Sequence, residues 1–289
     1  MDPRDTPFNG RVAHVSLQGQ VNADRFTAGE PHRARHVTTD IRSTPTGSRE
    51  RELVLGDAFL VLDQQEGWVF GRAEANGYVG WVDAVALGVG MPDPTHRVAV
   101  ARTYAKGKPE LKTTDRHVPL PFGAALHVLD ETDGWARLAW STDSVPGDLY
   151  VPAMHLAEIG GRQDDPVAVA RLFIGTPYLW GGNSAFGIDC SGLVQAAMLA
   201  CGVSCPGDSD QQRARLGQEI PLGAERRAGD LYFWEGHVGL LSDADTLLHA
   251  TAGYMATVEE PLDHAISRIA KSEQKPVLKR RRVTLFGAP

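Results

Sequence analysis

The sequence predicts a multidomain protein in which two small all-β barrels are followed by an α+β domain. Three observations predict this fold class: an internal repeat in the first half, a Gly- and Pro-rich segment between its two copies, and a change from strand-like to helical patterning near residue 165. The length of 289 residues suits two or three domains.

The internal repeat recurs at an offset of 67 residues. Residues 56–68 read GDAFLVLDQQEGW and residues 123–135 read GAALHVLDETDGW, with seven of the thirteen positions identical. Each copy has alternating apolar residues, a polar turn, and a Gly-Trp pair leading into another strand-like run, as short strands of small β-barrels do. The Gly- and Pro-rich segment over 88–95 separates the copies. The predicted segments are an N-terminal extension over 1–30, barrels over 31–90 and 95–158, and the last domain over 165–289.

Composition limits the classes of function. The net charge of −7 argues against a nucleic-acid-binding protein. The opening sequence, MDPRDTPFNGRVAHVSL, has no long apolar run, and no stretch is long enough to span a bilayer. Three cysteines suit a reducing compartment. We therefore expect a cytoplasmic protein without a membrane partner.

Two other features have unremarkable interpretations. Cys201 and Cys205 lack a second ligand pair, so no metal or other cofactor is expected. The basic run Lys279 to Arg282 lies in a segment that ends with residues 283–286 and is predicted to be a last strand, and we expect the run to be a solvated strand edge rather than a binding patch.

The strongest candidate for a nucleophile is Cys190. Good helix formers run from Leu193 to Ala200 and stop at Gly202, and Asp189 is a suitable N-cap, which places Cys190 in the first turn. Backbone N–H groups and the helix dipole favour a thiolate there and can hold an oxyanion. A cysteine before an apolar helix is more often structural, so a catalytic role for it depends on a base.

Two of the ten histidines have strand-like surroundings that supply such a base. His237 opens an apolar strand after the turn at 235–236, and His249 closes another strand twelve residues later. Adjacent strands joined by a turn over 242–245 would set the two rings side by side. One histidine could then deprotonate the thiol while the other orients it.

Four motifs in order resemble the NlpC/P60 family of cell-wall cysteine peptidases: Asp189-Cys190-Ser191-Gly192, Gly229-Asp230 before aromatics, His237-Val238-Gly239, and Leu248-His249-Ala250. The resemblance covers the last domain and implies a papain-like fold. It also implies that Cys190 is the nucleophile, His237 the base and His249 the polar third residue, and that the substrate is a peptidoglycan stem peptide. The repeated units resemble the bacterial SH3-like fold.

The two barrels ahead of the last domain resemble the branch of γ-D-glutamyl-L-diamino-acid endopeptidases similar to dipeptidyl-peptidase VI. That branch implies cleavage of the γ-D-Glu–diamino-acid bond in peptides with a free N-terminal L-Ala, as in recycling of imported muropeptides. By the same resemblance, Tyr78 and Asp189 would read the substrate amine. The remaining matched substrate-binding positions are Tyr178, Trp180, Ser191, Asp208 and Ser209.

Several alternatives stay open at this point. Tyr78 could simply fill a barrel rim, Asp189 could be only an N-cap, and the barrels could be spacers. The whole chain could be a non-catalytic cell-wall-binding protein, which would have no need of Cys190 and two histidines. An amidase or acyltransferase on the same scaffold also fits the triad. The residues do not distinguish diaminopimelate from lysine in the substrate.

Overall fold

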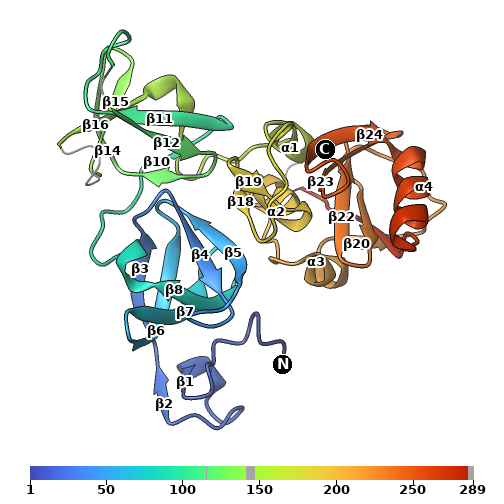
Figure 1. Cartoon of the computed structure of the whole chain (residues 1–289), viewed down its shortest axis with the longest axis horizontal. Coiled ribbons are helices and arrows are strands. Elements are labelled where there is room, and N and C mark those ends of the chain that lie inside the picture. The colour runs from blue at the N-terminus through green and yellow to red at the C-terminus, as the bar shows by residue number, and fades with distance from the viewer. Residues whose placement is uncertain (115, 141–146, 286–289) are drawn as a thin grey trace. The chain divides into compact units, whose positions relative to one another are not determined.

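The computed structural model describes residues 1–114, 116–140 and 147–285, and the chain divides into two compact units (Figure 1). The first unit is Met1–Gly161 and the second is Arg162–Pro289. The first consists of β-strands and short 3-10 turns, whereas the second combines four α-helices with a sheet among its described residues. This is the predicted order of all-β and α+β parts.

The first half of unit 1 is a seven-stranded sheet in the order β5-β4-β8-β7-β6-β3-β9. A buried apolar cluster that includes Ile41, Phe59 and Val82 fills its interior. The strands are β3 (Glu30–Ala34), β4 (Thr38–Arg42), β5 (Arg49–Val54), β6 (Ala58–Gln65), β7 (Trp68–Ala73), β8 (Val79–Asp83) and β9 (Leu87–Gly88).

The second half of unit 1 contains a five-stranded sheet, β12-β11-β16-β15-β14, and a three-stranded sheet, β13-β10-β17. Leu55 of the first half is buried in the apolar cluster of the second half, and Ala125 N–H donates to its carbonyl at 2.8 Å. The two halves therefore form one compact unit, and their separate boundaries stay predictions. The strands are β10 (His96–Val98), β11 (Arg102–Lys106), β12 (His117–Pro121), β13 (Ala125–Leu126), β14 (Val128–Thr132), β15 (Trp135–Leu138), β16 (Leu149–Pro152) and β17 (Leu156–Glu158).

The internal repeat corresponds to two hairpins of the same construction. The β6–β7 hairpin turns at Glu66 and Gly67 (φ 45° and 83°), and the β14–β15 hairpin turns at Asp133 and Gly134 (φ 52° and 77°). Positive φ at both central residues is what a type I′ turn requires, and glycine meets that requirement without strain. Both hairpins also have a register shift, at 61/63 and 128/130, again 67 residues apart. The sequence repeat is thus confirmed as a repeat of local structure.

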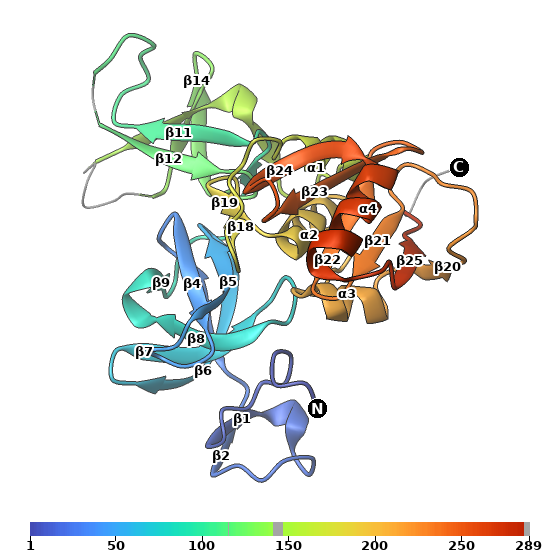
Figure 2. The ribbon, with the colours of Figure 1, turned by 45° about the vertical axis from the view of Figure 1, so that its right-hand side comes forward.

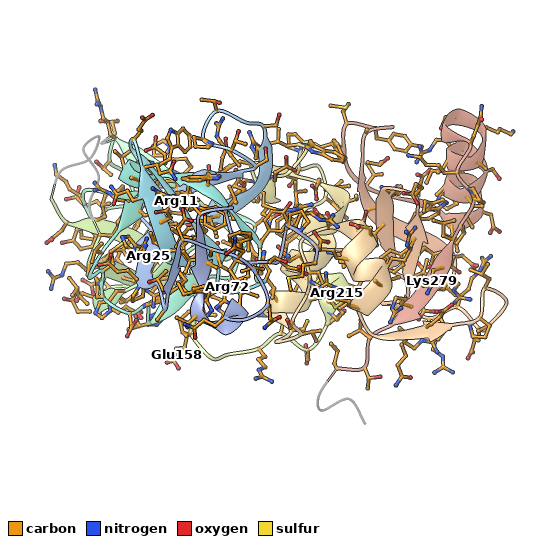
Figure 3. The ribbon with its side chains drawn as sticks, turned by 90° about the horizontal axis from the view of Figure 1, so that it is seen from below. Arg11, Arg25, Arg72, Glu158, Arg215 and Lys279 are labelled. Atoms are coloured by element: carbon orange, nitrogen blue, oxygen red, sulfur yellow. The ribbon has the colours of Figure 1, made fainter. Side chains whose placement is uncertain are left out.

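The N-terminal extension packs on the first half rather than standing apart. Its short strands β1 (Val12–His14) and β2 (Arg25–Thr27) pair in parallel, and Val12 joins a buried cluster with residues of the first sheet. The buried Asp63 accepts hydrogen bonds from the side chains of Asn9 at 2.8 Å and Arg11 at 2.6 Å. Arg11 and Arg25, both labelled in Figure 3, form ion pairs with this carboxylate. Asp63 therefore holds two segments of the extension.

Unit 2 is built on a six-stranded antiparallel sheet, β20-β25-β21-β22-β23-β24, with α4 on one face and α1 and α2 on the other (Figure 2). The predicted helix after Pro166 is confirmed, with Pro166 in its first turn and Asp165 as its N-cap. None of the described helices is long and apolar enough to cross a membrane. The elements are α1 (Pro166–Arg171), β18 (Asn183–Ser184), β19 (Gly187–Ile188), α2 (Cys190–Ala200), α3 (Ser209–Arg215), β20 (Gln218–Ile220), β21 (Leu231–Trp234), β22 (His237–Leu241), β23 (Thr246–Thr251), β24 (Ala256–Pro261), α4 (Leu262–Glu273) and β25 (Lys279–Arg282).

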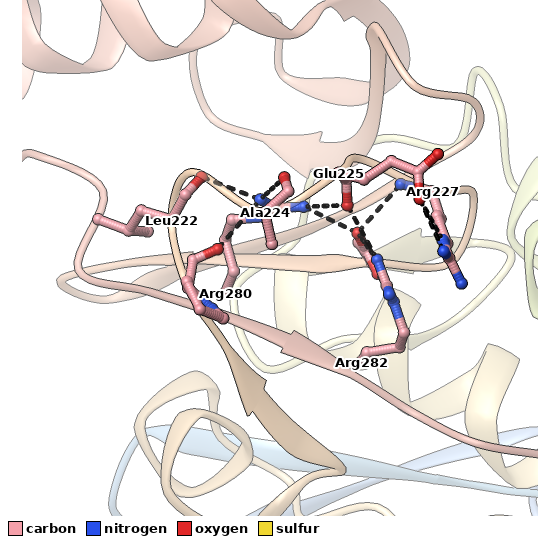
Figure 4. Close-up of polar contacts among 8 residues, drawn as sticks. Leu222, Ala224, Glu225, Arg227, Arg280 and Arg282 are labelled. Atoms are coloured by element: carbon pink, nitrogen blue, oxygen red, sulfur yellow. Dashed lines mark hydrogen bonds and ion pairs between the residues drawn. The ribbon is translucent and has the colours of Figure 1, made fainter.

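The predicted last strand is confirmed, but the expectation that its basic run is a solvated edge is wrong. The basic run is itself strand β25, which pairs with β20 on one side and β21 on the other. Arg280 is buried and donates to the carboxylate of Asp230 at 2.9 Å and to the carbonyls of Leu222 and Ala224, as Figure 4 shows. Residues 283–285 are not a strand, and Phe286 lies outside the described residues. These buried contacts hold the loop that enters β21.

Candidate active site

Cys190 is the first residue of helix α2, as predicted. Asp189 is the N-cap, and its Oδ1 accepts the backbone N–H of Gly192 at 2.7 Å. Cys190 is 4% exposed, and its Sγ lies 4.0 Å from the carbonyl oxygen of Gly236. Gly236 is the residue before His237, so the thiol lies at the start of β22. This position also gives Cys190 the positive end of the helix dipole, which favours the thiolate.

The loop before α2 approaches the helix start closely. Gly181 donates its N–H to Asp189 Oδ2 at 3.0 Å, and the Ser191 hydroxyl donates to Asp189 Oδ1 at 3.0 Å. A Cβ on Gly192 would lie 2.5 Å from the carbonyl oxygen of Gly182, so only glycine allows this approach. Asp189 is thus a buried acceptor for the loop and the helix at once.

The prediction that two strands set His237 and His249 side by side is confirmed. His237 Nε2 lies 2.9 Å from His249 Nδ1, and the ring centroids are 5.1 Å apart. Gly239 makes this contact possible, because a Cβ there would lie 3.0 Å from the Cβ of His249. His249 is fully buried, whereas His237 is half-buried. The pair has the geometry of a base and the group that orients it.

Burial sets the protonation of both rings. Burial lowers the pKa of His237 well below 6.5, and the nearby His249 lowers it further. Burial also lowers the pKa of His249, although a hydrogen bond with Glu260 opposes this shift. Both imidazoles are therefore neutral at neutral pH, as a proton acceptor must be.

Two residues near the site were missed by the sequence reasoning. Glu260 of β24 has its Oε1 2.9 Å from His249 Nε2. Gln212 of α3 is buried and donates to the carbonyls of Ser191 and Pro206, both at 2.9 Å. For Glu260 the available signal was an acidic residue in a strand-like run soon after His249; for Gln212 there was none beyond its place in a polar helix.

The predicted substrate-binding residues come from several segments of the fold. Asp189 and Ser191 flank Cys190 directly. Tyr178 and Trp180 lie in the loop before α2, Tyr178 half-buried and Trp180 66% exposed. Asp208 is the N-cap of α3 and Ser209 is its first residue. Tyr78 belongs to unit 1, where it is 3% exposed within the apolar cluster, and its role in recognition stays a prediction.

Metal binding requires a cluster of ligating side chains, which can be looked for among the described residues. Over residues 1–114, 116–140 and 147–285, no group of three or more His, Cys, Asp or Glu side chains is placed to hold a metal ion. The thiol at the start of α2 and the two neutral imidazoles on the neighbouring strands support one kind of chemistry: nucleophilic attack on a carbonyl with proton transfer by a ring.

Comparison with known proteins agrees with this geometry. A family model described as NlpC/P60 family matches residues 175–272, and one described as bacterial dipeptidyl-peptidase Sh3 domain matches residues 41–87. A γ-D-glutamyl-L-lysine dipeptidyl-peptidase from Bacillus subtilis (strain 168) is 30% identical over 220 residues, which is 70% of this chain and 72% of that protein. The chain belongs to the NlpC/P60 family. It is accordingly a cysteine peptidase.

Other NlpC/P60 proteins extend the comparison. Dipeptidyl-peptidase 6 from Lysinibacillus sphaericus is 38% identical over 120 residues, covering 42% of this chain and 41% of that protein. The crystal structure of an NlpC/P60 family protein from Bacillus cereus ATCC 10987 has a TM-score of 0.72 at 18% identity, covering 88% of this chain and 99% of that one. This likeness shows the fold: an SH3 domain followed by the papain-like NlpC/P60 domain. The Sh3 model matches only the first of the two repeated units.

The neutral histidines of this NlpC/P60 site predict the pH dependence of its activity. Because the folded pKa of His237 lies below 6.5, the ring stays unprotonated as the pH falls through 6.5. We expect the acidic limb of kcat/KM to have its midpoint below pH 6.5. A pH–rate profile between pH 4 and 9 measures it, and a midpoint above 6.5 would contradict the assignment of His237 as a base that is neutral at neutral pH.

Proposed function

We propose that this peptidase hydrolyses the γ-D-Glu–diamino-acid bond of peptidoglycan stem peptides that have a free N-terminal L-Ala. The observation that carries the proposal is the 2.9 Å contact between His237 and His249 on strands beside the Cys190 thiol. The substrate class is supported by the relatives in Bacillus subtilis and Bacillus cereus, both named γ-D-glutamyl-L-lysine dipeptidyl-peptidase.

The proposed reaction is acyl transfer through a thioester. His237 takes the thiol proton, and the Cys190 sulfur attacks the carbonyl carbon of the γ-D-glutamyl amide. Backbone N–H groups in the first turn of α2 stabilise the oxyanion, and the imidazolium returns its proton to the leaving amine. A water molecule, deprotonated by His237, then hydrolyses the thioester and regenerates the thiol.

Recognition of the free amine is assigned to Asp189. A substrate ammonium that leaves water needs a charged hydrogen-bond partner, and Asp189 is a buried carboxylate one residue from the nucleophile. Tyr178, Trp180, Ser191, Asp208 and Ser209 are proposed to contact the rest of the peptide. Lysine and diaminopimelate are both compatible with this set.

The remaining proposals concern the second repeated unit, over residues 95–158, and the cellular role of the protein. The second repeated unit has the same bulge and type I′ turn as the first, which supports a second SH3-like domain over 95–158 beside one over 31–90. We also propose a cytoplasmic location, supported by the three cysteines of the sequence, and a role in recycling of muropeptides, supported by the proposed substrate.

Blocking the substrate amine tests the recognition step. We expect N-acetyl-L-Ala-γ-D-Glu-L-Lys to have a kcat/KM roughly 10- to 100-fold lower than the free peptide, the loss of one charged hydrogen-bonded contact. The N-methyl-alanine peptide keeps the positive charge and is the matched control. Equal turnover of the acetylated and free peptides would refute recognition of the amine while leaving the cysteine mechanism intact.

A further inference from the structure

The hydrogen-bonded chain at the active site does not end at His249. On the side away from His237, His249 Nε2 lies 2.9 Å from Glu260 Oε1, in a part of the sheet where both residues are buried. The antiparallel register pairs His249 with Val258, so Glu260, two residues on, lies on the same face of the sheet as His249. The neighbouring Glu259 lies on the opposite face and contacts Arg171 instead.

Three further side chains hold the Glu260 carboxylate. Arg268 Nη2 donates to Oε1 at 2.5 Å, His264 Nδ1 lies 2.9 Å from Oε2, and the Tyr254 hydroxyl donates to Oε2 at 3.3 Å. The Arg268 guanidinium also lies 5.1 Å from the centroid of the Tyr254 ring. Hydrogen bonds from His249 and Arg268 overcome burial and lower the pKa of Glu260 to about 2, so the carboxylate is ionised across the working pH range.

An ionised carboxylate decides which nitrogens carry protons. It can only accept, so His249 Nε2 must carry the hydrogen of their contact. In the neutral His249 ring, Nδ1 then has no hydrogen and must accept one from His237 Nε2, 2.9 Å away. The neutral His237 ring is left with its lone pair on Nδ1. Each step follows from the preceding contact and from the donor capacity of a neutral imidazole.

We propose that Glu260 is a positioning residue that fixes the tautomers of His249 and His237 and thereby makes His237 Nδ1 the nitrogen that takes the thiol proton of Cys190. The inference rests on the proposed catalytic roles of these three residues. When the proton moves from sulfur to Nδ1, His237 becomes an imidazolium whose Nε2–H already points at His249. The negative charge of Glu260, reached through that ring, stabilises the imidazolium and the thiolate together.

The charged groups around His237 and His249 determine whether a substitution raises or lowers the pKa of the two imidazoles. The titratable or charged groups around the two rings and the Glu260 carboxylate are Cys190 on α2, Glu260 on β24, Tyr254 in the preceding turn, His264 and Arg268 on α4, and Lys275 beyond it. Among them Glu260 raises the pKa of both imidazoles, whereas Arg268 lowers it. Neutralising Glu260 and neutralising Arg268 should therefore have opposite effects on the proton affinity of His237.

The test uses the rate at which iodoacetamide alkylates Cys190 in the full chain, measured between pH 5 and 9 by peptide mass spectrometry. Alkylation reports the thiolate directly and needs no peptide substrate. We expect Glu260→Gln, which keeps the shape and loses the charge, to lower the rate at pH 7 by about tenfold, equivalent to about one pKa unit. Arg268→Gln should raise the rate. Glu259→Gln, on the same strand, should leave it unchanged.

Measurement of kcat and KM distinguishes a positioning role of Glu260 from a purely structural one. Glu260 lies behind His249 and touches no substrate, so Glu260→Gln should lower kcat roughly 10- to 100-fold, as loss of a partner that orients a functional histidine does, with little change in KM. Wild-type alkylation and kcat in Glu260→Gln would overturn the proposal, and so would a slower alkylation in Arg268→Gln matching that in Glu260→Gln. If the wild-type enzyme leaves the γ-D-glutamyl peptide intact, the proposed substrate fails, while the alkylation profile still decides the role of Glu260.

Discussion

Replacing Cys190 with alanine is expected to lower kcat for cleavage of L-Ala-γ-D-Glu-L-Lys by roughly 10⁴-fold or more, because loss of the nucleophile removes the covalent route and leaves only binding and oxyanion contacts. Replacing His237 with alanine should cost nearly as much, since thiol and ring act as one unit. Steady-state product release, quantified by mass spectrometry, measures both.

The chain supplies a matched control for this loss. Cys201 is also buried near an end of α2, but burial raises the pKa of its thiol to about 11, so it stays protonated and unreactive. Cys201→Ala should therefore keep the wild-type kcat. Activity that persists in Cys190→Ala, or disappears equally in Cys201→Ala, would contradict the assignment of Cys190 as the nucleophile.

Replacing Arg280 with methionine is expected to destabilise unit 2 by about 3–5 kcal/mol, the cost of breaking a buried ion pair by removing one partner. Arg280 is 1% exposed, and its loss removes the donor to the carbonyls of Leu222 and Ala224 and breaks the buried ion pair with Asp230. Hydrogen exchange in β21 and β22 measures the change locally, which suits a chain with two units.

Lys279, the neighbour of Arg280 on β25, is the control for this prediction. Its ion pair with Glu219 is partly exposed at both ends. Surface pairs of this kind contribute about 0–1 kcal/mol, so Lys279→Met should change exchange protection little. Equal protection in the two variants would show that the buried contacts of Arg280 do not stabilise the sheet.

Features encoded by neighbouring residues were predictable from the sequence. The helix at Cys190 follows from Asp189 as N-cap and Gly202 as its end, and the two repeated hairpins follow from Glu66-Gly67 and Asp133-Gly134. The facing of His237 and His249 also follows locally, because a short turn joins their strands. In each case, residues within about a dozen positions determine the outcome.

Features that depend on sheet order were not predictable in this way. The basic run of β25 was expected at an edge, but β20, formed by only three residues, covers that edge and places Arg280 in the interior. Glu260 joins the active site through its register with β23 and through Arg268 of α4. Periodicity indicates that strands exist, but it does not indicate which strands pair.

The most direct test of the proposed function is product analysis with the wild-type enzyme and two peptides, L-Ala-γ-D-Glu-L-Lys and its meso-diaminopimelate counterpart. The proposed function predicts that at least one peptide yields intact L-Ala-γ-D-Glu and the free diamino acid. Release of free L-Ala, or recovery of both peptides uncut by the unmodified enzyme, would contradict it. Alkylation of Cys190 by iodoacetamide in a separate sample shows that this enzyme is folded and that its thiol is reactive.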